Sequence, residues 1–215
     1  MAVGVVGRDA ELGAIAHALT SRPAGLNAVV VEGVAGIGKT SLLRHVFEQH
    51  ADGIALAARP VESEHRLTFA ALADLLEGVP AESLTGLPAP QQVALDAALL
   101  RGSEVHAPGV RAVGTALRTV LTRLTQQGPL LVVVDDVQWA DEPSVAAFAF
   151  AVRRLDDCRV RIVVAERVED GAAPLDPLRL DSDLPERPTH VRVGPLSLAA
   201  IFHAVREHTG VALSR

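Results

Sequence analysis

Residues 28–43, AVVVEGVAGIGKTSLL, decide the fold class of this chain. The three valines predict a buried strand, and the apolar run after Lys39 is compatible with a helix. Between them stands Gly33-x-x-x-x-Gly38-Lys39-Thr40, which has the spacing of a phosphate-binding loop. Glycines reach backbone angles closed to other residues, so successive N–H groups can turn inward around a triphosphate. The stretch therefore predicts a nucleotide site at a helix N-terminus, whose free donors and dipole favour anions.

The polar side chains of this loop have separate expected roles. Lys39 is expected to reach the β- and γ-phosphates, and the Thr40 hydroxyl is expected to ligate Mg²⁺. Lys39 is the only lysine of the chain, and every other basic side chain is arginine, which argues against a glycine turn without a ligand. The residues expected to contact the nucleotide here are Gly33, Val34, Ala35, Gly36, Ile37, Gly38, Lys39, Thr40 and Ser41.

A second motif ends in two carboxylates. Residues 130–134, LLVVV, are typical of a parallel strand buried on both faces, and Asp135 and Asp136 follow directly. Beside a phosphate loop this is the Walker B arrangement. Asp135 is expected to hold Mg²⁺ through water, and Asp136 to orient or deprotonate the attacking water. A strand ending in a simple Asp-Asp turn is the alternative, and the Gly33–Thr40 loop favours the functional interpretation.

Another apolar run, residues 159–165, predicts a further buried strand that ends at Glu166 and Arg167. Arg167 is then on the same edge of the sheet as the two aspartates. It is a candidate for contact with the γ-phosphate. The expected catalytic residues are therefore Lys39, Asp136 and Arg167. A solvated surface arginine is equally compatible with this position.

The rest of the chain predicts an alternation of helices and strands. We expect a helix over residues 9–19 with Asp9 as its N-cap, and a helix over 39–49. Trp139 is expected to be a packing residue, and the histidines to have surface or capping roles. The other expected elements are strands at 54–58 and 191–193, helices at 68–76, 91–100, 109–127, 143–155 and 198–208, a connection at 78–90 and an irregular loop at 168–188.

Composition limits the class of protein. The 215 residues, 49% hydrophobic and 21% charged, are enough for one sizeable α/β domain. The net charge of −6 gives no electrostatic footprint for nucleic acid, and no apolar run is long enough to span a membrane. No secretion signal is evident, and the single Cys158 excludes an internal disulfide. We therefore expect a cytoplasmic protein without membrane contact.

Three stretches together resemble one family. Residues 6–12 (VGRDAEL), GVAGIGKTSLL and VVVDDVQWADEPS look like the ATPase domain of large ATP-binding LuxR-type transcriptional regulators. These regulators belong to the signal-transduction ATPases with numerous domains, within the AAA+-like P-loop group. LTFAALADLLEGVP resembles the helical insert of the same proteins. The resemblance implies a parallel five-stranded sheet in the order 5-1-4-3-2 with helices on both faces, and an ATP/ADP switch used in signal transduction.

The resemblance also assigns residues. It places Val6, Gly7 and Arg8 at the adenine pocket, Arg167 at a sensor position and Pro195 near adenine. We expect residues 1–215 to form a single P-loop ATPase domain with a helical insert at 59–128, without the family's lid, sensor repeats and DNA-binding region. Self-association through the ATPase domain is expected, and direct nucleic-acid binding is not. A small-molecule phosphotransferase and a non-hydrolysing nucleotide-binding interaction module are the alternatives.

Overall fold

The computed structural model describes residues 5–22, 24–50, 53–101, 108–155, 158–169, 176, 178–184 and 186–209. Its centre is a parallel five-stranded sheet in the order β2-β3-β4-β1-β5. Taken from the other edge, this is the order 5-1-4-3-2, so the predicted fold class is confirmed. The strands are β1 (Leu26–Gly33), β2 (Ile54–Ala58), β3 (Leu130–Val134), β4 (Val160–Arg167) and β5 (Thr189–Arg192).

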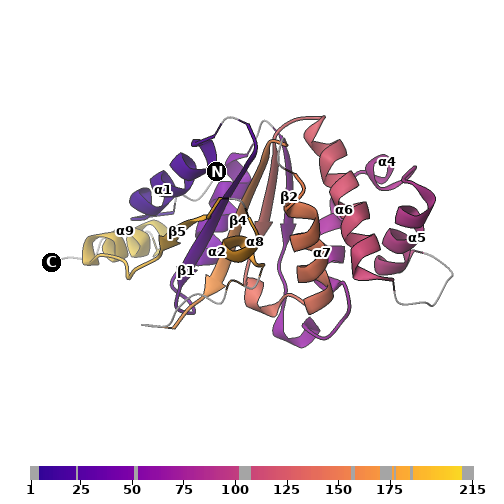
Figure 1. The fold of residues 1–215 in the computed structure, drawn as a ribbon. Helices are drawn as coiled ribbons and strands as arrows, with labels where there is room; N and C mark the ends of the chain where they lie inside the picture. The colour runs from indigo at the N-terminus through magenta and orange to yellow at the C-terminus, as the bar shows by residue number, and fades with distance from the viewer. Residues whose placement is uncertain are drawn as a thin grey trace.

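Helices cover both faces of the sheet (Figure 1). The helices α1 (Asp9–Thr20) and α2 (Lys39–Gln49) pack on one face. The insert between β2 and β3 and the helix after β3 supply the other face. The insert and this helix consist of a 3-10 turn η1 (Glu62–Glu64), α3 (Ala70–Glu77), α4 (Ala81–Leu84), α5 (Ala89–Ala98), α6 (Val110–Thr125) and α7 (Glu142–Val152). Two further helices, α8 (Leu180–Asp183) and α9 (Leu198–Thr209), come later in the chain. In Figure 1, α4 and α5 lie at one end of the molecule and α9 at the other.

Alternating side chains of the strands form two cores. On β1, Val29 and Val31 face α1 and α2, whereas Ala28 and Val30 face the helices of the other layer. All four side chains are buried. Burial on both faces explains why the middle of β1 and the whole of β3 are uninterrupted apolar runs in the sequence.

Some predicted boundaries need correction. The N-cap of α1 is Arg8, without a side-chain capping bond, so the prediction that Asp9 is the cap is wrong. Asp9 is the first helical residue, where its charge still favours the positive end of the helix dipole. The connection at 78–90 contains the short helix α4, and the loop at 168–188 contains α8. Helix α4 begins after Pro80, whose carbonyl accepts the first turn's bond from Ser83 N–H.

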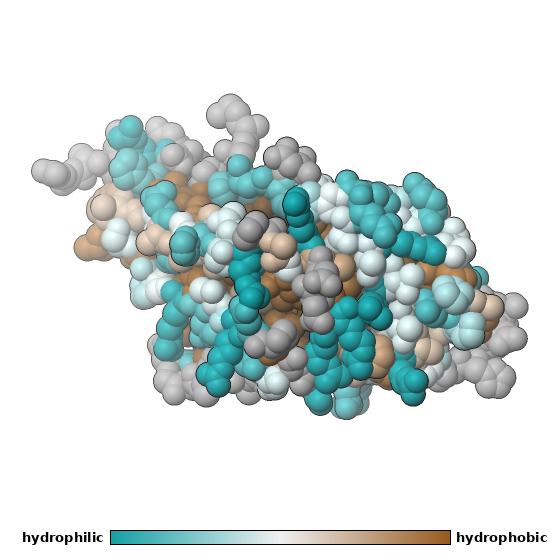
Figure 2. Space-filling model, turned by 45° about the horizontal axis from the view of Figure 1, so that its top comes forward, coloured by the Kyte–Doolittle hydropathy of each residue, from teal (hydrophilic) through white to brown (hydrophobic). Residues whose placement is uncertain are grey.

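Among the described residues, no helix is long and apolar enough to cross a membrane. Helix α9 exposes the large apolar side chains of Leu198, Ile201 and Phe202. Figure 2 shows hydrophobic colour at the left end of the molecule, where α9 lies.

Candidate functional site

A cavity of about 370 Å³ lies at the carboxyl ends of the central strands, where open α/β sheets bind ligands. The strands β1 and β4 are neighbours, and their last residues, Gly33 and Arg167, are register partners. The cavity is lined by Ala35, Gly36, Gly38, Lys39, Thr40, Asp136, Gln138, Trp139 and Arg167. Three motifs that are far apart in the sequence therefore meet in one hollow.

The phosphate loop has the backbone that its glycines predict. Gly36 and Gly38 have φ of +74° and +107°, which L side chains rarely adopt. Helix α2 begins at Lys39, so the first N–H groups of the helix have no partner within it. Unpaired donors at the positive end of a helix dipole provide a site for an anion.

Lys39 is folded back against its own loop. The residue is 6% exposed, and its ammonium donates to the carbonyls of Gly33 at 2.9 Å and Val34 at 3.0 Å. Burial lowers the pKa of Lys39 below its ordinary 10.5, while the nearby charges of Asp136 and Asp135 oppose this shift and Arg167 adds to it. Two of the three ammonium donors are used, and the third is available to an anion in the cavity.

Asp135 is buried at the end of β3, with 6% of its surface exposed. Its Oδ1 accepts the N–H of Asp136 at 3.0 Å, but its Oδ2 accepts no hydrogen bond from the described residues. The Nε of Arg59, an exposed side chain, lies 3.8 Å from that Oδ2. A buried carboxylate oxygen without a hydrogen bond is a suitable ligand for a hard cation, directly or through water.

Asp136 lies on the cavity wall in a left-handed conformation, with φ of +48°. Its carboxylate accepts a hydrogen bond from the side-chain amide of Gln138 at 3.0 Å. The amide oxygen of Gln138 accepts the backbone N–H of Arg167 at 3.1 Å. Sequence reasoning did not single out Gln138, because its partner on β4 is 29 residues away.

Trp139, expected only as a packing residue, is partly exposed and forms part of the cavity wall. It ends a 3-10 turn, η2 (Val137–Trp139), that directly follows Asp136. One feature of the sequence indicates this role of Trp139. The residue follows closely after the two carboxylates, so it lies in a loop that must start at the carboxyl end of β3.

Other predicted site residues do not line the cavity. Arg8 is 4% exposed, and its guanidinium donates to the carbonyls of Ile37 at 2.8 Å and Gly194 at 2.7 Å and bonds Glu11. Arg8 therefore ties the phosphate loop to the segment that contains Pro195, which is exposed. The lining also lacks Gly33, Val34, Ile37, Ser41, Asp135, Val6 and Gly7. The adenine contacts of Val6, Gly7, Arg8 and Pro195 stay predictions.

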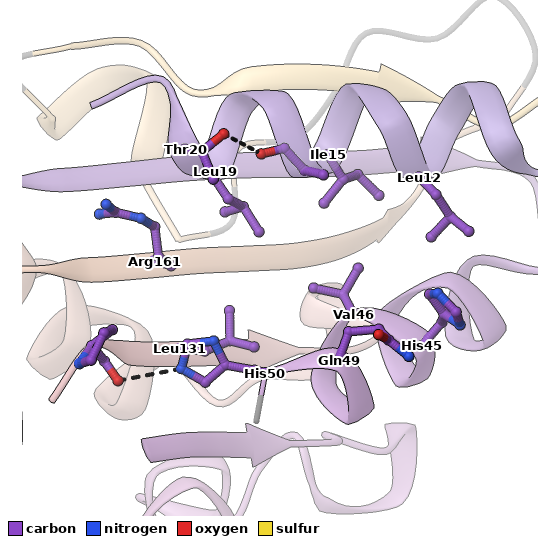
Figure 3. Close-up of a pocket in the computed structure, with 12 residues that line it drawn as sticks. Leu12, Ile15, Leu19, Thr20, His45, Val46, Gln49, His50, Leu131 and Arg161 are labelled. Atoms are coloured by element: carbon purple, nitrogen blue, oxygen red, sulfur yellow. Dashed lines mark hydrogen bonds between the residues drawn. The ribbon is translucent and has the colours of Figure 1, made fainter. Parts of the chain in front are cut away.

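A second cavity, of about 380 Å³, lies between α1 and α2 (Figure 3). Leu12, Ile15 and Leu19 of α1 face Val46 of α2 across it. Pro129, just before β3, and Arg161, near the start of β4, place it toward the amino ends of the strands. It is therefore separate from the cavity of the phosphate loop.

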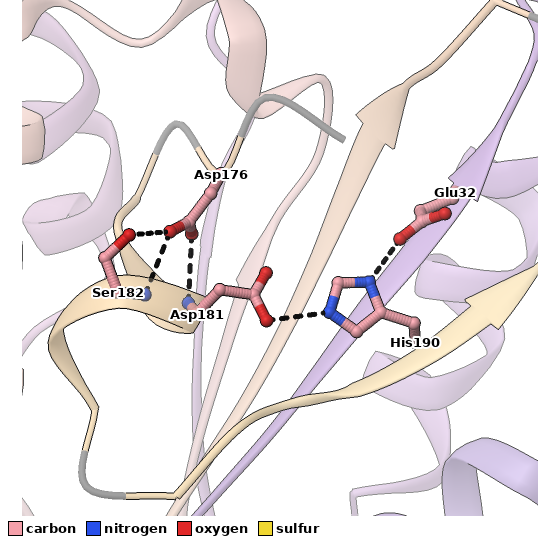
Figure 4. A network of polar contacts seen from close by, with 5 residues as sticks. All are labelled: Glu32, Asp176, Asp181, Ser182 and His190. Carbon is pink, nitrogen blue, oxygen red and sulfur yellow. Dashed lines mark hydrogen bonds and ion pairs between the residues drawn. The ribbon is translucent and has the colours of Figure 1, made fainter. Parts of the chain in front are cut away.

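A histidine network lies on the edge strand β5 (Figure 4). The His190 ring contacts Glu32 of β1 through Nδ1 and Asp181 of α8 through Nε2, the latter at 3.0 Å. Burial lowers the pKa of His190, but the bonds to Glu32 and Asp181 outweigh it, so the pKa lies above the ordinary 6.5. No pattern in the sequence predicts this role, because the partner Glu32 is 158 residues away.

In the part of the chain that the structure describes, no group of three or more His, Cys, Asp or Glu side chains could hold a metal ion. This finding is compatible with Mg²⁺ at a nucleotide site. Mg²⁺ usually keeps several waters and takes one or two protein oxygens plus phosphates.

The parallel sheet, the loop with left-handed glycines and the two carboxylates after β3 define a P-loop nucleotide-binding domain. The chain belongs to the AAA ATPase domain family, whose model matches residues 4–164. Membership of this family implies that the ligand is a nucleotide, which is usually bound together with Mg²⁺. No curated protein matches the sequence significantly.

Solved structures agree on the fold. The Orc1 protein of Aeropyrum pernix, in complex with DNA, has a TM-score of 0.53 at 18% identity over 94% of this chain and 49% of its own. The Drosophila origin recognition complex bound to DNA gives a TM-score of 0.50 at 15% identity over 84% of this chain and 42% of its own.

A signal transduction ATPase with numerous domains and a tetratricopeptide repeat sensor, from Pyrococcus horikoshii, gives a TM-score of 0.49 at 17% identity over 97% of this chain and 26% of its own. The chain thus spans about half the length, or less, of these three proteins.

Proposed function

We propose that this chain is an ATP-binding, Mg²⁺-dependent switch domain with slow hydrolysis. One observation carries the proposal: Lys39, Thr40, Asp136 and Arg167 line a single cavity at the carboxyl ends of the strands. These are the side chains that Mg-ATP binding and phosphoryl transfer to water require.

The phosphate loop would bind the polyphosphate. Gly38, Lys39 and Thr40, at the N-terminus of α2, all line the same cavity. Thr40 and Asp135 would hold Mg²⁺, because a hydroxyl and a buried carboxylate oxygen without a hydrogen bond are ligands that this ion accepts. Bound Mg²⁺ neutralises charge on the β- and γ-phosphates. The residues present therefore fit the ion.

Asp136 would orient a water for attack on the γ-phosphate, and Arg167 would contact the same phosphate. The Arg167 side chain is exposed, so it does not by itself enclose the reacting group. An arginine supplied by another copy or domain accelerates many such reactions. We therefore propose that hydrolysis by the isolated chain is slow and that self-association through this domain accelerates it.

The biological role that we propose is that of a regulatory module in a LuxR-type transcriptional regulator. The support is the VGRDAEL stretch, the tryptophan-containing loop after the two aspartates, and the helical insert. In this proposal residues 1–215 form one ATPase domain, and DNA is not a ligand of this chain. The net charge of −6 supports the latter point.

A small-molecule phosphotransferase is the competing proposal, and it needs an acceptor pocket beside the γ-phosphate. The second large cavity lies toward the amino ends of the strands and cannot place an acceptor there. We therefore propose water as the acceptor.

Two variants test the proposed function. Lys39→Ala should weaken Mg-ATP binding by at least about a hundredfold in calorimetry, because the loop loses its only lysine. Asp136→Asn should bind Mg-ATP but hydrolyse it at least about a hundredfold more slowly in a single-turnover assay. Unchanged affinity in the first variant would refute the site. Unchanged hydrolysis in the second would refute the role of Asp136, and binding without turnover in the wild type would leave the interaction-module alternative.

A further inference from the structure

Gln138 connects two groups that the proposed reaction uses. Its side-chain Nε2 donates to Asp136 Oδ1 at 3.0 Å, and its Oε1 accepts the backbone N–H of Arg167 at 3.1 Å. An amide nitrogen only donates and an amide oxygen only accepts. Both partners therefore specify the same orientation of the Gln138 amide.

The two ends of this bridge differ in rigidity. Arg167 is the last residue of β4, and Gly33 of β1 accepts the N–H of the following Val168 at 3.2 Å. Asp136 instead begins a loop in a left-handed conformation, where a residue other than glycine is strained by about 1 kcal/mol. Gln138 thus fixes a carboxylate of the loop to the backbone of the sheet.

We propose that Gln138 is the positioning residue of the hydrolytic site. It holds one oxygen of Asp136 by a hydrogen bond and leaves the other oxygen to accept a proton of the attacking water. The same bridge fixes Asp136 relative to the β4 terminus, which carries the Arg167 side chain. The inference rests on the proposed function, since it deepens the role of Asp136 in hydrolysis.

The alternative is that Gln138 merely stabilises the loop. A stabilising role predicts equal losses in stability, nucleotide affinity and rate. A positioning role predicts a loss of rate that exists only while the Asp136 carboxylate is present. These two patterns are separable by a double-mutant cycle.

The chain offers a matched control in the insert. Gln92 has the same kind of bridge, because its amide nitrogen donates to Asp96 at 3.1 Å and its amide oxygen accepts the backbone N–H of Leu87 at 3.3 Å. The Gln92 amide nitrogen also donates to the carbonyl of Leu84 at 3.1 Å. Gln92→Met therefore removes a bridge of the same kind, with one bond more, without touching the cavity. It should match Gln138→Met in thermal stability to within a few degrees.

The experiment compares single-turnover ATP hydrolysis, Mg-ATP affinity by calorimetry, and thermal unfolding. Gln138→Met, which removes both bonds, and Gln138→Glu, which keeps only the acceptor for Arg167 N–H, should each slow hydrolysis about tenfold or more. Their affinity for Mg-ATP should change less than about threefold. Gln92→Met should leave rate and affinity unchanged, and Gln138→Met should not slow Asp136→Asn any further.

The possible results separate the two proposals. If Asp136→Asn is slow but Gln138→Met is as fast as the wild type, the positioning role alone is wrong. An equal slowing by Gln138→Met in the wild-type and Asp136→Asn backgrounds, or a parallel loss of affinity, also overturns it. If Asp136→Asn is as fast as the wild type, or the wild type does not turn over, the proposed hydrolytic function fails and this inference fails with it.

Discussion

The carboxylate of Asp141 accepts the backbone N–H of Phe69 at 2.8 Å, although 72 residues separate them. Its other oxygen accepts the N–H of Ala71 at 3.1 Å, and the first also caps α7 through Ser144 N–H at 2.9 Å. One buried carboxylate therefore organises the start of α3 and the start of α7. It also holds Phe69, which is buried with φ of +63°.

Replacing Asp141 should destabilise the fold strongly. Asp141→Ala leaves three N–H donors without their partner, one of them from the strained Phe69 and one from the first turn of α3, so we expect a loss of about 3 kcal/mol in the free energy of unfolding. Urea unfolding measures this loss. Asp176→Ala is the control, because Asp176 also accepts three hydrogen bonds but nearer the surface, and it should lose only about 1 kcal/mol. Similar losses in both variants would contradict the role of Asp141.

Two glycines should respond oppositely to alanine. Gly7 has φ of +73°, and a Cβ there would lie 2.3 Å from the Cβ of Ala200 on α9. Gly7→Ala should therefore lower the free energy of unfolding by about 2 kcal/mol or displace α9.

Gly13 is the matched control for this prediction. It lies inside α1, and an added Cβ would meet nothing within 4 Å. Gly13→Ala should raise stability by about 0.5–1 kcal/mol, because alanine favours the helix. Thermal unfolding compares the two variants, and stabilisation by Gly7→Ala would show that α9 does not pack on this glycine.

The His190 network predicts a dependence of stability on pH. The pKa of His190 is raised in the folded protein, so its contribution is complete below 6.5, the ordinary value, and is lost as pH rises through the folded value. We expect His190→Gln to lose about 1 kcal/mol in the free energy of unfolding at pH 5.5 and less at pH 8.5. Urea unfolding at both values measures the difference. A loss that grows with pH would mean that the ring is neutral in its contacts with Glu32 and Asp181.

Arg8 should stabilise the phosphate loop through its hydrogen bond to the carbonyl of Ile37. Arg8→Ala removes the bonds to the carbonyls of Ile37 and Gly194, so the loop loses a buried anchor. We expect Mg-ATP affinity to fall about tenfold in calorimetry, because two bonds from a charged donor are lost. Arg22→Ala, which removes an ion pair between exposed side chains with Glu186, should leave affinity unchanged. Equal affinities in both variants would show that the anchor does not matter for binding.

Local patterns predicted much of this fold. The bounds of α2 and β2 agree with the prediction. Helix α6 could be predicted because its apolar face repeats with the helical period, although it is three residues shorter than predicted. The phosphate loop and Asp136 line one cavity, since parallel strands present their carboxyl ends at one edge.

Contacts between distant residues could not be predicted in this way. The bridge of Gln138 to β4 and the bond of Asp141 to Phe69 depend on how the loops meet in space. No periodicity or spacing in the sequence encodes them. The helices α4 and α8 span four residues each, which is too short for a helical period to be detected.

Trp139 provides the most direct test of the nucleotide site, because it is the only tryptophan of the chain and lines the cavity. Titration of the wild type with Mg-ATP should change its emission saturably, since an indole senses a ligand beside it. The same titration of Lys39→Ala should give no change at concentrations that saturate the wild type. An unchanged emission in the wild type, or an equal response in Lys39→Ala, would contradict binding of Mg-ATP in the cavity of the phosphate loop.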